Sequence, residues 1–247
     1  MNNILAILSI IFLSTLIQST FSFGGALVAL PLLVFFIDVR FATALVTLLA
    51  GSIAIAVVSQ NWRDVEFQNA WRLIISAFVG IPLGILFLSN FDGTIIKIVL
   101  AVTVLVFTTI NLITVRKIQV PHLNYAFGFG FVSGLFGGAY NMSGPPVVLY
   151  GSLADWRPSH FRTTIQSYAL FTNIFAIIGH YLAGNITTQV GTYYLYSLPL
   201  VAVTIWLGNY LHKVTPSEQY AKYVKILLLI LAVNLFLSAL WQLYQAS

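Results

Sequence analysis

Two apolar stretches of this chain are interrupted in the same way, by a Phe-Gly-Gly-Ala tetrad with proline downstream. The first tetrad is residues 23–26, before Pro31, and the second is residues 136–139, before Pro145 and Pro146. An unpaired peptide group in hydrocarbon costs several kcal/mol, so irregular backbone at membrane depth must pack in protein or line a polar cavity. The two breaks therefore restrict the chain to folds that shelter both of them.

The composition excludes a water-soluble surface, because hydrophobic residues make up 59% of the chain and charged residues only 7%. Most charge-free windows are long enough for a helix across a core of roughly 30 Å, which takes about 20 residues. The net charge of +5 comes from basic residues that stand singly between apolar segments, as at the flanks of membrane helices, and does not indicate a nucleic-acid surface. There are no cysteines and no alternating strand pattern. The sequence predicts an all-α polytopic membrane protein.

The resemblance between the two halves extends beyond the glycines. The series Phe41, Gly84 and Asn111 in the first half returns in the same order, and at similar intervals, as Phe161, Gly208 and Asn234 in the second. We therefore expect two repeats, residues 1–118 and 119–247. Corresponding interrupted segments in two halves are a pointer to the binding site of a transporter.

The distribution of basic residues favours a hairpin for each interrupted segment. If each segment crossed the membrane once, four basic residues would face one side and seven the other. If each is a hairpin that enters and leaves on the same side, only Arg40 and Lys97 face one side and the other nine face the opposite side. Cytoplasmic loops carry the excess of Lys and Arg, so we expect hairpins, inverted repeats and both termini outside, in the periplasm.

The expected elements are eight helical segments, or ten when the arms of the hairpins are counted separately. In the first repeat they are a hairpin at 4–37 and spans at 42–60, 71–89 and 95–114. In the second repeat they are a hairpin at 123–153 and spans at 163–183, 192–211 and 222–244.

Each hairpin tip is a candidate anion site. The first N–H groups of a half-helix lack partners and carry a partial positive charge, while glycine allows a ligand to approach the backbone. Proline fits the start of such half-helices, and Gln18 and Ser22 are further polar candidates at the first tip. The predicted substrate-binding residues are Gly24, Gly25, Gly137, Gly138, Asn141, Ser143, Gly144, Gln166, Thr43, Thr163 and Arg162. The alternative for the glycines is close packing of helices by small residues.

The acidic residues argue against a cation carrier. All six lie near the ends of apolar segments, whereas a cation path normally contains carboxylates. An anion held by backbone N–H groups and neutral side chains needs no carboxylate. Arg40 and Arg162 are either attractors of anions at the two mouths or ordinary anchors at the membrane interface. His180 is a candidate proton relay or a structural histidine.

The two glycine motifs resemble those of the TauE/SafE sulfite exporter family. The likeness includes residues 23–26 with Pro31, the run from Gly134 to Pro146, and Phe161 with Arg162, and it extends over nearly the whole chain. The resemblance implies a permease of a bacterial-type inner membrane that carries sulfite, sulfonates or related sulfur anions.

We therefore expect a secondary transporter that binds a small anion between the two tips and works by alternating access. A passive anion channel is the alternative, and an intramembrane serine protease using Ser143 and His180 is a remote one. The main reading implies no enzymatic activity, cofactor, metal or nucleic acid. Its partners are the substrate anion and the lipid bilayer, with protons as a candidate coupling ion and a homo-oligomer left open.

Overall fold

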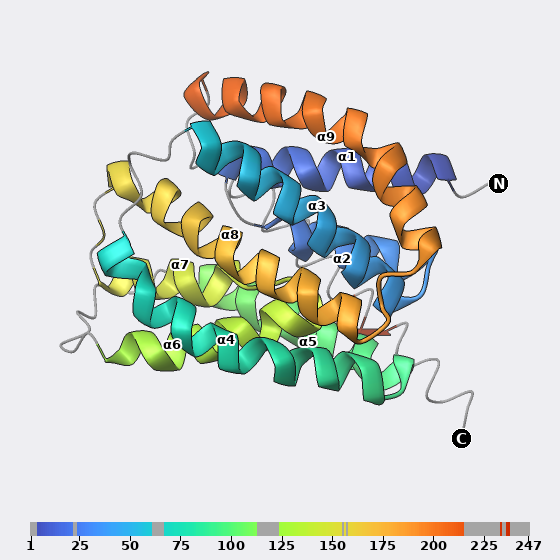
Figure 1. The fold of residues 1–247 in the computed structure, drawn as a ribbon, viewed down its shortest axis with the longest axis horizontal. Coiled ribbons are helices and arrows are strands. Elements are labelled where there is room, and N and C mark those ends of the chain that lie inside the picture. Colours follow the sequence, from blue (N-terminus) through green and yellow to red (C-terminus); the bar gives the residue numbers. More distant parts are fainter. Residues whose placement is uncertain are drawn as a thin grey trace.

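The computed structural model describes residues 4–21, 24–60, 67–112, 124–154, 156, 158–214, 233, 236 and 237. Over these residues the chain forms helices and turns and no strand, which confirms the all-α prediction for this part (Figure 1). The helices are α1 (Ile4–Phe21), α2 (Gly25–Leu33), α3 (Val39–Gln60), α4 (Phe67–Asn90), α5 (Gly93–Leu112), α6 (Tyr125–Tyr140), α7 (Gly144–Leu153), α8 (Pro158–Leu182) and α9 (Thr188–Val214). The expected span at 222–244 and the linker at 115–122 lie outside the described residues, apart from Val233, Phe236 and Leu237.

The first interrupted segment is a pair of helices that fold back on each other. Gly24, between α1 and α2, has a φ of 92°, a conformation that glycine adopts at little cost. A Cβ on Gly25 would lie 3.1 Å from the carbonyl oxygen of Ser14, so α2 returns along α1. Nearly every residue of α2 is buried, which makes it a short helix inside the protein.

The second interrupted segment has the same form. Asn141, which follows α6, has a left-handed φ of 53°. The Ser133 hydroxyl on α6 donates to the carbonyl of Ser143, and the rings of Phe129 and Tyr150 lie 5.6 Å apart. Residues further before the break on α6 contact residues further after it on α7, as Ser133 with Ser143 and Phe129 with Tyr150 show. Helix α7 therefore runs antiparallel to α6.

The closest helix packing joins α4 to α6, through glycines on both helices. A Cβ on Gly134 would collide with the backbone of Ala77, and one on Gly138 with the backbone of Ile81. Reciprocally, a Cβ on Gly84 would collide with the carbonyl oxygen of Leu135. Small residues let helix backbones approach closely in membranes. The matched numbering also shows that α4 and α6 run parallel.

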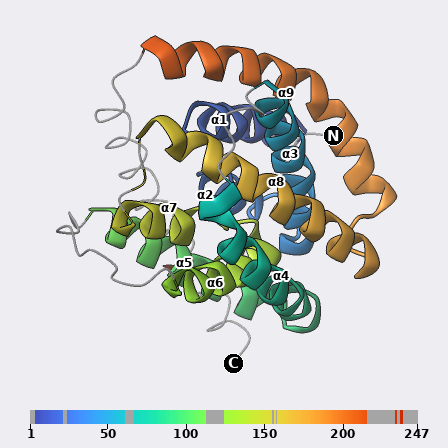
Figure 2. The ribbon, with the colours of Figure 1, turned by 60° about the vertical axis from the view of Figure 1, so that its left-hand side comes forward.

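Helix α9 packs along α1 in the same manner. The Thr204 hydroxyl donates to Thr15 Oγ1 at 3.1 Å, and a Cβ on Gly208 would lie 2.5 Å from the Cβ of Ser19. These helices also run parallel. Helix α9 bends over the molecule and contains Pro199, whose missing N–H and ring interrupt the helical ladder (Figure 2).

At one end of the helix bundle, hydrogen bonds join the start of α3, the end of α4 and the segment after α8. The Arg40 guanidinium donates to the carbonyls of Leu88 (2.9 Å) and Phe91 (2.7 Å), which joins the start of α3 to the end of α4. Asn185, after α8, donates to Ser89 Oγ at 3.3 Å. The first hairpin opens toward this end, because α2 leads into α3 there.

Aromatic contacts mark the opposite end, where α4 begins. The rings of Trp71 on α4 and Phe127 on α6 lie 6.1 Å apart, and Trp156, after α7, lies 5.8 Å from Tyr150. The second hairpin therefore opens toward this end, where its first arm α6 begins and its second arm α7 ends. The two hairpins enter the protein from opposite ends and their tips point toward each other.

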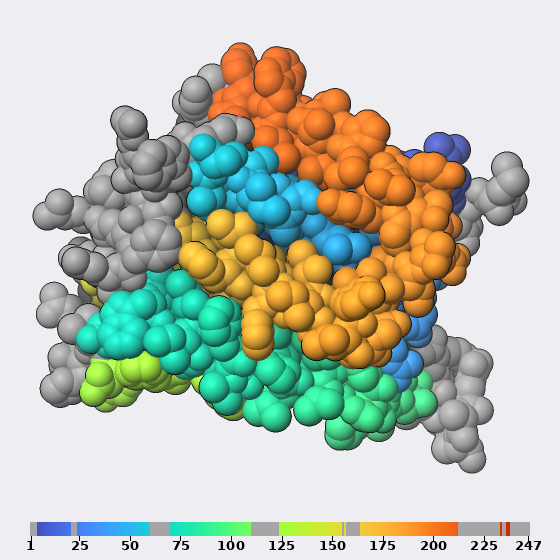
Figure 3. All heavy atoms as spheres, in the orientation of Figure 1, coloured from blue at the N-terminus to red at the C-terminus, as the bar shows by residue number. Residues whose placement is uncertain are grey.

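The outward faces of the helices are apolar, as expected in lipid. In the described part of the chain, three helical stretches are long and apolar enough to cross a membrane, within α3, α4 and α9, and shorter apolar stretches lie in α1 and α5. On α4, large apolar side chains such as Trp71, Ile75 and Val79 are exposed on a face that none of the described helices covers. Helix α8 lies between α3 and α4 on the face in Figure 3. The chain is an integral membrane protein.

Candidate functional site

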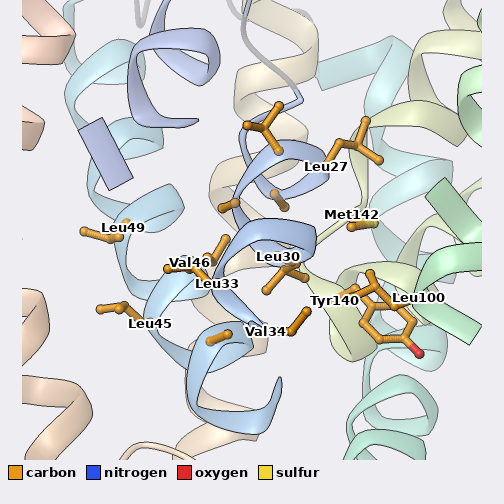
Figure 4. Close-up of a cluster of buried hydrophobic side chains, with 14 of the residues drawn as sticks. Leu27, Leu30, Leu33, Val34, Leu45, Val46, Leu49, Leu100, Tyr140 and Met142 are labelled. Atoms are coloured by element: carbon orange, nitrogen blue, oxygen red, sulfur yellow. The ribbon is translucent and has the colours of Figure 1, made fainter. Parts of the chain in front are cut away.

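The two hairpin tips meet at one cavity. About 410 Å³ of space, part of it open to solvent, lies between the atoms there. It is lined by Gln18, Gly24, Ala26, Leu27, Asn141, Met142, Ser143, Gly144, Pro145, Ile165, Tyr168, Ala169 and Asn173. Figure 4 shows Leu27 of α2 and Met142 of the second tip in the same cluster of buried hydrophobic side chains. Helix α8 supplies the remaining wall.

At the first tip, the start of α2 offers backbone donors. The Gly25 N–H donates to Gln18 Oε1 at 2.9 Å, and the first bond back along the chain is from the Val28 N–H to the Gly24 carbonyl at 3.2 Å. The N–H groups of Ala26 and Leu27 come between them and have no partner within the helix. Both residues line the cavity.

At the second tip, the start of α7 offers fewer backbone donors. Pro145 and Pro146 stand at its second and third positions and have no N–H, so Gly144 supplies the only free amide of the first three. Ser143 precedes the helix, and its hydroxyl makes no capping bond to it. The hydroxyl is therefore available to a ligand in the cavity.

Side-chain hydrogen bonds hold the second tip against α8. Asn141 Nδ2 donates to Asn173 Oδ1 at 2.7 Å, and Asn173 Nδ2 donates to the Ala169 carbonyl at 2.7 Å. Tyr168 donates to Ser133 Oγ at 2.7 Å, and Ser133 in turn donates to the Ser143 carbonyl. Tyr168 and Ser133 are fully buried. Buried polar groups that are satisfied in this way fix one geometry of the tip.

The electrostatics of the cavity suit an anion. Its described lining contains no Asp, Glu, Lys, Arg or His. The N-terminus of each half-helix carries about half a positive charge, from aligned peptide dipoles. Among the described residues, no group of three or more His, Asp or Glu side chains could hold a metal ion. The site can thus hold a small anion by neutral donors.

The structure brings together four of the predicted site residues, namely Gly24, Asn141, Ser143 and Gly144, as cavity lining. Gly25 and Gly137 lie directly beside it: a Cβ on Gly137 would be 3.2 Å from the Cβ of Ser143.

The other predicted site residues do not line the cavity or are not fully described. Gly138 packs against α4, and Thr43 and Gln166 are buried on α3 and α8 but are not among the residues that line the cavity. Arg162 and Thr163 belong to α8, but their side chains lie outside the described part, as does Ser22.

The structure corrects one role expected from the sequence and bears on another that the sequence left open. Pro31 was expected at the start of a half-helix, but it is the seventh residue of α2, because the helix begins at Gly25. For Arg40, an attractor of anions or an anchor, the structure favours the anchor, because its guanidinium donates to the carbonyls of Leu88 and Phe91 at the end of α4. Favourable placement of a cation at a helix C-terminus explains this position.

The wall that α8 supplies was largely missed. Ile165, Tyr168, Ala169 and Asn173 follow the spacing i, i+3, i+4, i+8, which places them on one helix face. That spacing is present in the sequence, but it gives no indication of which face meets the tips.

The protease alternative finds no support in the geometry. His180 is fully buried near the end of α8, where its Nδ1 lies 3.2 Å from Asn185 Nδ2. Within the described residues no hydrogen bond joins His180 to Ser143, as a nucleophile and its base would need.

No curated protein and no solved structure matches the chain. A family model does: that of the TauE/SafE sulfite exporters matches residues 7–235, which include the cavity between the hairpin tips and all of α1 to α9 except the first three residues of α1. Membership implies a membrane transporter and not an enzyme. With nearly its whole length matched, this chain belongs to the TauE/SafE sulfite exporter family.

Proposed function

We propose that the chain is a secondary transporter for a small anion, namely sulfite, an organosulfonate or a related sulfur oxyanion. The anion binds between the two hairpin tips and is exposed alternately on each side of a bacterial-type inner membrane, as the two inverted repeats rock against each other. Both termini face the periplasm. Protons as the coupling ion and assembly into a homo-oligomer belong to the same proposal.

The observation that carries the proposal is the convergence of two helix N-termini on a cavity whose described lining contains no ionised side chain. An anion gains from both partial positive charges and from the amides of Ala26, Leu27 and Gly144. A cation would meet the same charges without a carboxylate to hold it, so the site disfavours cations.

The proposal is tested by thermal unfolding of the purified protein with sulfite, methanesulfonate, sulfoacetate, sulfate and taurine. A ligand that binds only the folded state raises the melting temperature. Ser143→Ala removes the hydroxyl that precedes α7 and makes no capping bond, and should reduce the shift. Ser152→Ala is the matched control, because that exposed hydroxyl only bonds to the Val148 carbonyl on α7. Equal shifts in the two variants would place the anion elsewhere.

Flux measurements in proteoliposomes separate the carrier from a channel. A carrier must change conformation in each cycle, so its flux saturates as the anion concentration passes the dissociation constant. Flux that rises linearly over the same range would favour the passive channel.

A further inference from the structure

Gln18 stands between two cavities. It lines the cavity between the tips and also a second one between the first hairpin and α3, where about 250 Å³ of space, part of it open to solvent, lies between the atoms. The second cavity is walled by Ser14, Thr15, Gln18, Gly25, Ala26, Ala29, Val46, Leu49, Ala50 and Ile53. Gln18 is the one side chain long enough to block or connect the two spaces, since the other shared residue is Ala26.

The carboxamide oxygen of Gln18 accepts a hydrogen bond from the Gly25 N–H, a backbone donor that an anion would use. The Gly25 N–H is the first amide of α2, and it donates to Gln18 Oε1 at 2.9 Å. Gly24, directly before the helix, supplies no side chain for capping. The oxygen that satisfies this helix start therefore comes from α1, seven residues back along the chain.

The first glycine pair provides room for this arrangement. A Cβ on Gly25 would lie 2.8 Å from both the Cβ and the Oε1 of Gln18, closer than carbon and oxygen atoms can pack. Only glycine at position 25 lets the carboxamide lie across the start of α2.

Among the described residues, the second tip shows no equivalent plug. The residue seven positions before Gly144, where α7 begins, is Gly137, which has no side chain to accept a hydrogen bond from the helix start. Ser143 makes no capping bond there either. The two tips therefore differ: the second is open to a ligand, and the first is covered by a neutral acceptor.

We propose that Gln18 is the gating residue of the first tip: its carboxamide oxygen holds the place of a substrate oxygen on Gly25, and an arriving anion displaces it. This rests on the proposed function, because the substrate must bind at the tips. Hydrogen bonds to an ionised acceptor are roughly twice as strong as those between neutral groups, so an anion displaces the carboxamide and a neutral solute does not. The displaced side chain turns toward the second cavity.

Three substitutions in the full-length protein test the gate, with methanesulfonate as the probe and calorimetric titration as the readout. Gln18→Ala and Gln18→Leu remove the competing oxygen, and Leu keeps most of the volume. Both should tighten methanesulfonate binding by about two- to tenfold, the range that corresponds to the net strength of one hydrogen bond. Gln18→Glu places a tethered carboxylate on the same amide. It should weaken methanesulfonate binding at least about tenfold while raising the melting temperature of the free protein.

Weaker binding in both the Ala and the Leu variants would overturn the inference, because Gln18 would then be a ligand of the substrate. Unchanged affinity in the Glu variant would overturn it as well. Ser143→Ala separates these results from a failure of the proposed function, since it weakens binding whenever the anion lies at the tips. If methanesulfonate, sulfite and sulfate all fail to bind the unaltered protein, the proposed function and the gate fail together.

Discussion

At the scale of single residues, Asn141 has two separable roles. Its backbone reverses the chain in the left-handed region, at φ 53°, and its side chain links the tip to Asn173. Asn tolerates that conformation, whereas most other side chains pay roughly 1–2 kcal/mol for it. Glycine adopts it at little cost.

We expect Asn141→Gly and Asn141→Ala to reduce anion binding equally, because both lose the amide that faces the cavity. Only the Ala variant should also unfold more easily, by about 1 kcal/mol relative to the Gly variant. Anion-induced shifts and melting temperatures measure the two effects separately. Full anion binding in the Gly variant would show that the amide serves the turn alone.

Arg40 is expected to matter for stability and not for binding. Arg40→Ala leaves the carbonyls at the end of α4 without their cation, which should lower the free energy of unfolding by about 1–3 kcal/mol. The affinity for methanesulfonate should stay unchanged in Arg40→Ala and in the charge-preserving Arg40→Lys. If affinity falls in the Ala variant and returns in the Lys variant, Arg40 draws the anion after all.

Residue roles at the tips could be predicted only in part from the sequence. The tetrad at 136–139 was expected to be the break, but it lies in the last turns of α6 and the chain reverses just after it, at Asn141. Asn141 and Ser143 do line the cavity. The tetrad alone could not show that Gly137 and Gly138 have different roles. Adjacent positions on a helix point about 100° apart, so the two glycines face different neighbours. The first faces Ser143, whereas the second faces α4, and that difference depends on the tertiary position of α4.

At the scale of helices, the contact between α4 and α6 depends on the absence of side chains. Gly134→Ala would push a methyl group into the backbone of Ala77, so the helices must separate along their whole contact. We expect a loss of about 1–3 kcal/mol, the usual cost of overpacking. Gly128→Ala on the same helix has open space and is the matched control. It should be neutral or stabilising by up to about 1 kcal/mol. Equal melting temperatures for the two variants would contradict the close packing.

The two half-helices together set the charge that the site can hold. Each N-terminus contributes about half a positive charge, so the pair compensates about one negative charge. We expect the monovalent methanesulfonate to compete at least about tenfold better than divalent sulfate, because a second charge would lack compensation in a low dielectric.

Sulfite provides a second measurement of the same effect. Its apparent affinity should rise as falling pH converts it to the monovalent hydrogensulfite, while the affinity for methanesulfonate stays constant over that range. A parallel change for both anions would point to a titrating group of the protein instead of the ligand.

Element boundaries followed from the sequence where breaks and charges mark them. Asp92 caps α5 by accepting from the Thr94 N–H at 2.8 Å, and helix breaks occur at Gly24 and Asn141. The prediction that Pro31 starts a half-helix was wrong. Proline is typical of the first turn of a helix, yet Pro31 is tolerated in the buried interior of α2. Which helix faces pair across the bundle was not predictable, because apolar residues cover both the lipid side and the protein side of these helices.

At the scale of the whole molecule, the helices pack in related pairs. The first arm of one hairpin, α6, runs parallel to α4, and the first arm of the other, α1, runs parallel to α9. In the sequence alignment of the two halves, Gly84 of α4 corresponds to Gly208 of α9, and each glycine contacts one of these arms. In each half, a helix therefore packs against the hairpin of the other half. This reciprocal packing supports the proposal of inverted repeats.

The proposed topology places the ends of the bundle on opposite sides of the membrane, and the absence of cysteine makes this directly measurable. Four exposed positions serve as labelling sites when each is replaced by cysteine. Two are at the end where the first hairpin opens, Asn90→Cys and Ala183→Cys, and two are near the other end, Ser59→Cys and Ser152→Cys. An impermeant maleimide should label the first two in intact cells and the last two only after permeabilisation. The reverse pattern would invert the assignment of the termini and keep the architecture. Labelling of Asn90→Cys and Ser59→Cys from the same side would contradict the membrane crossing of α3 and α4, and with it the alternating-access proposal.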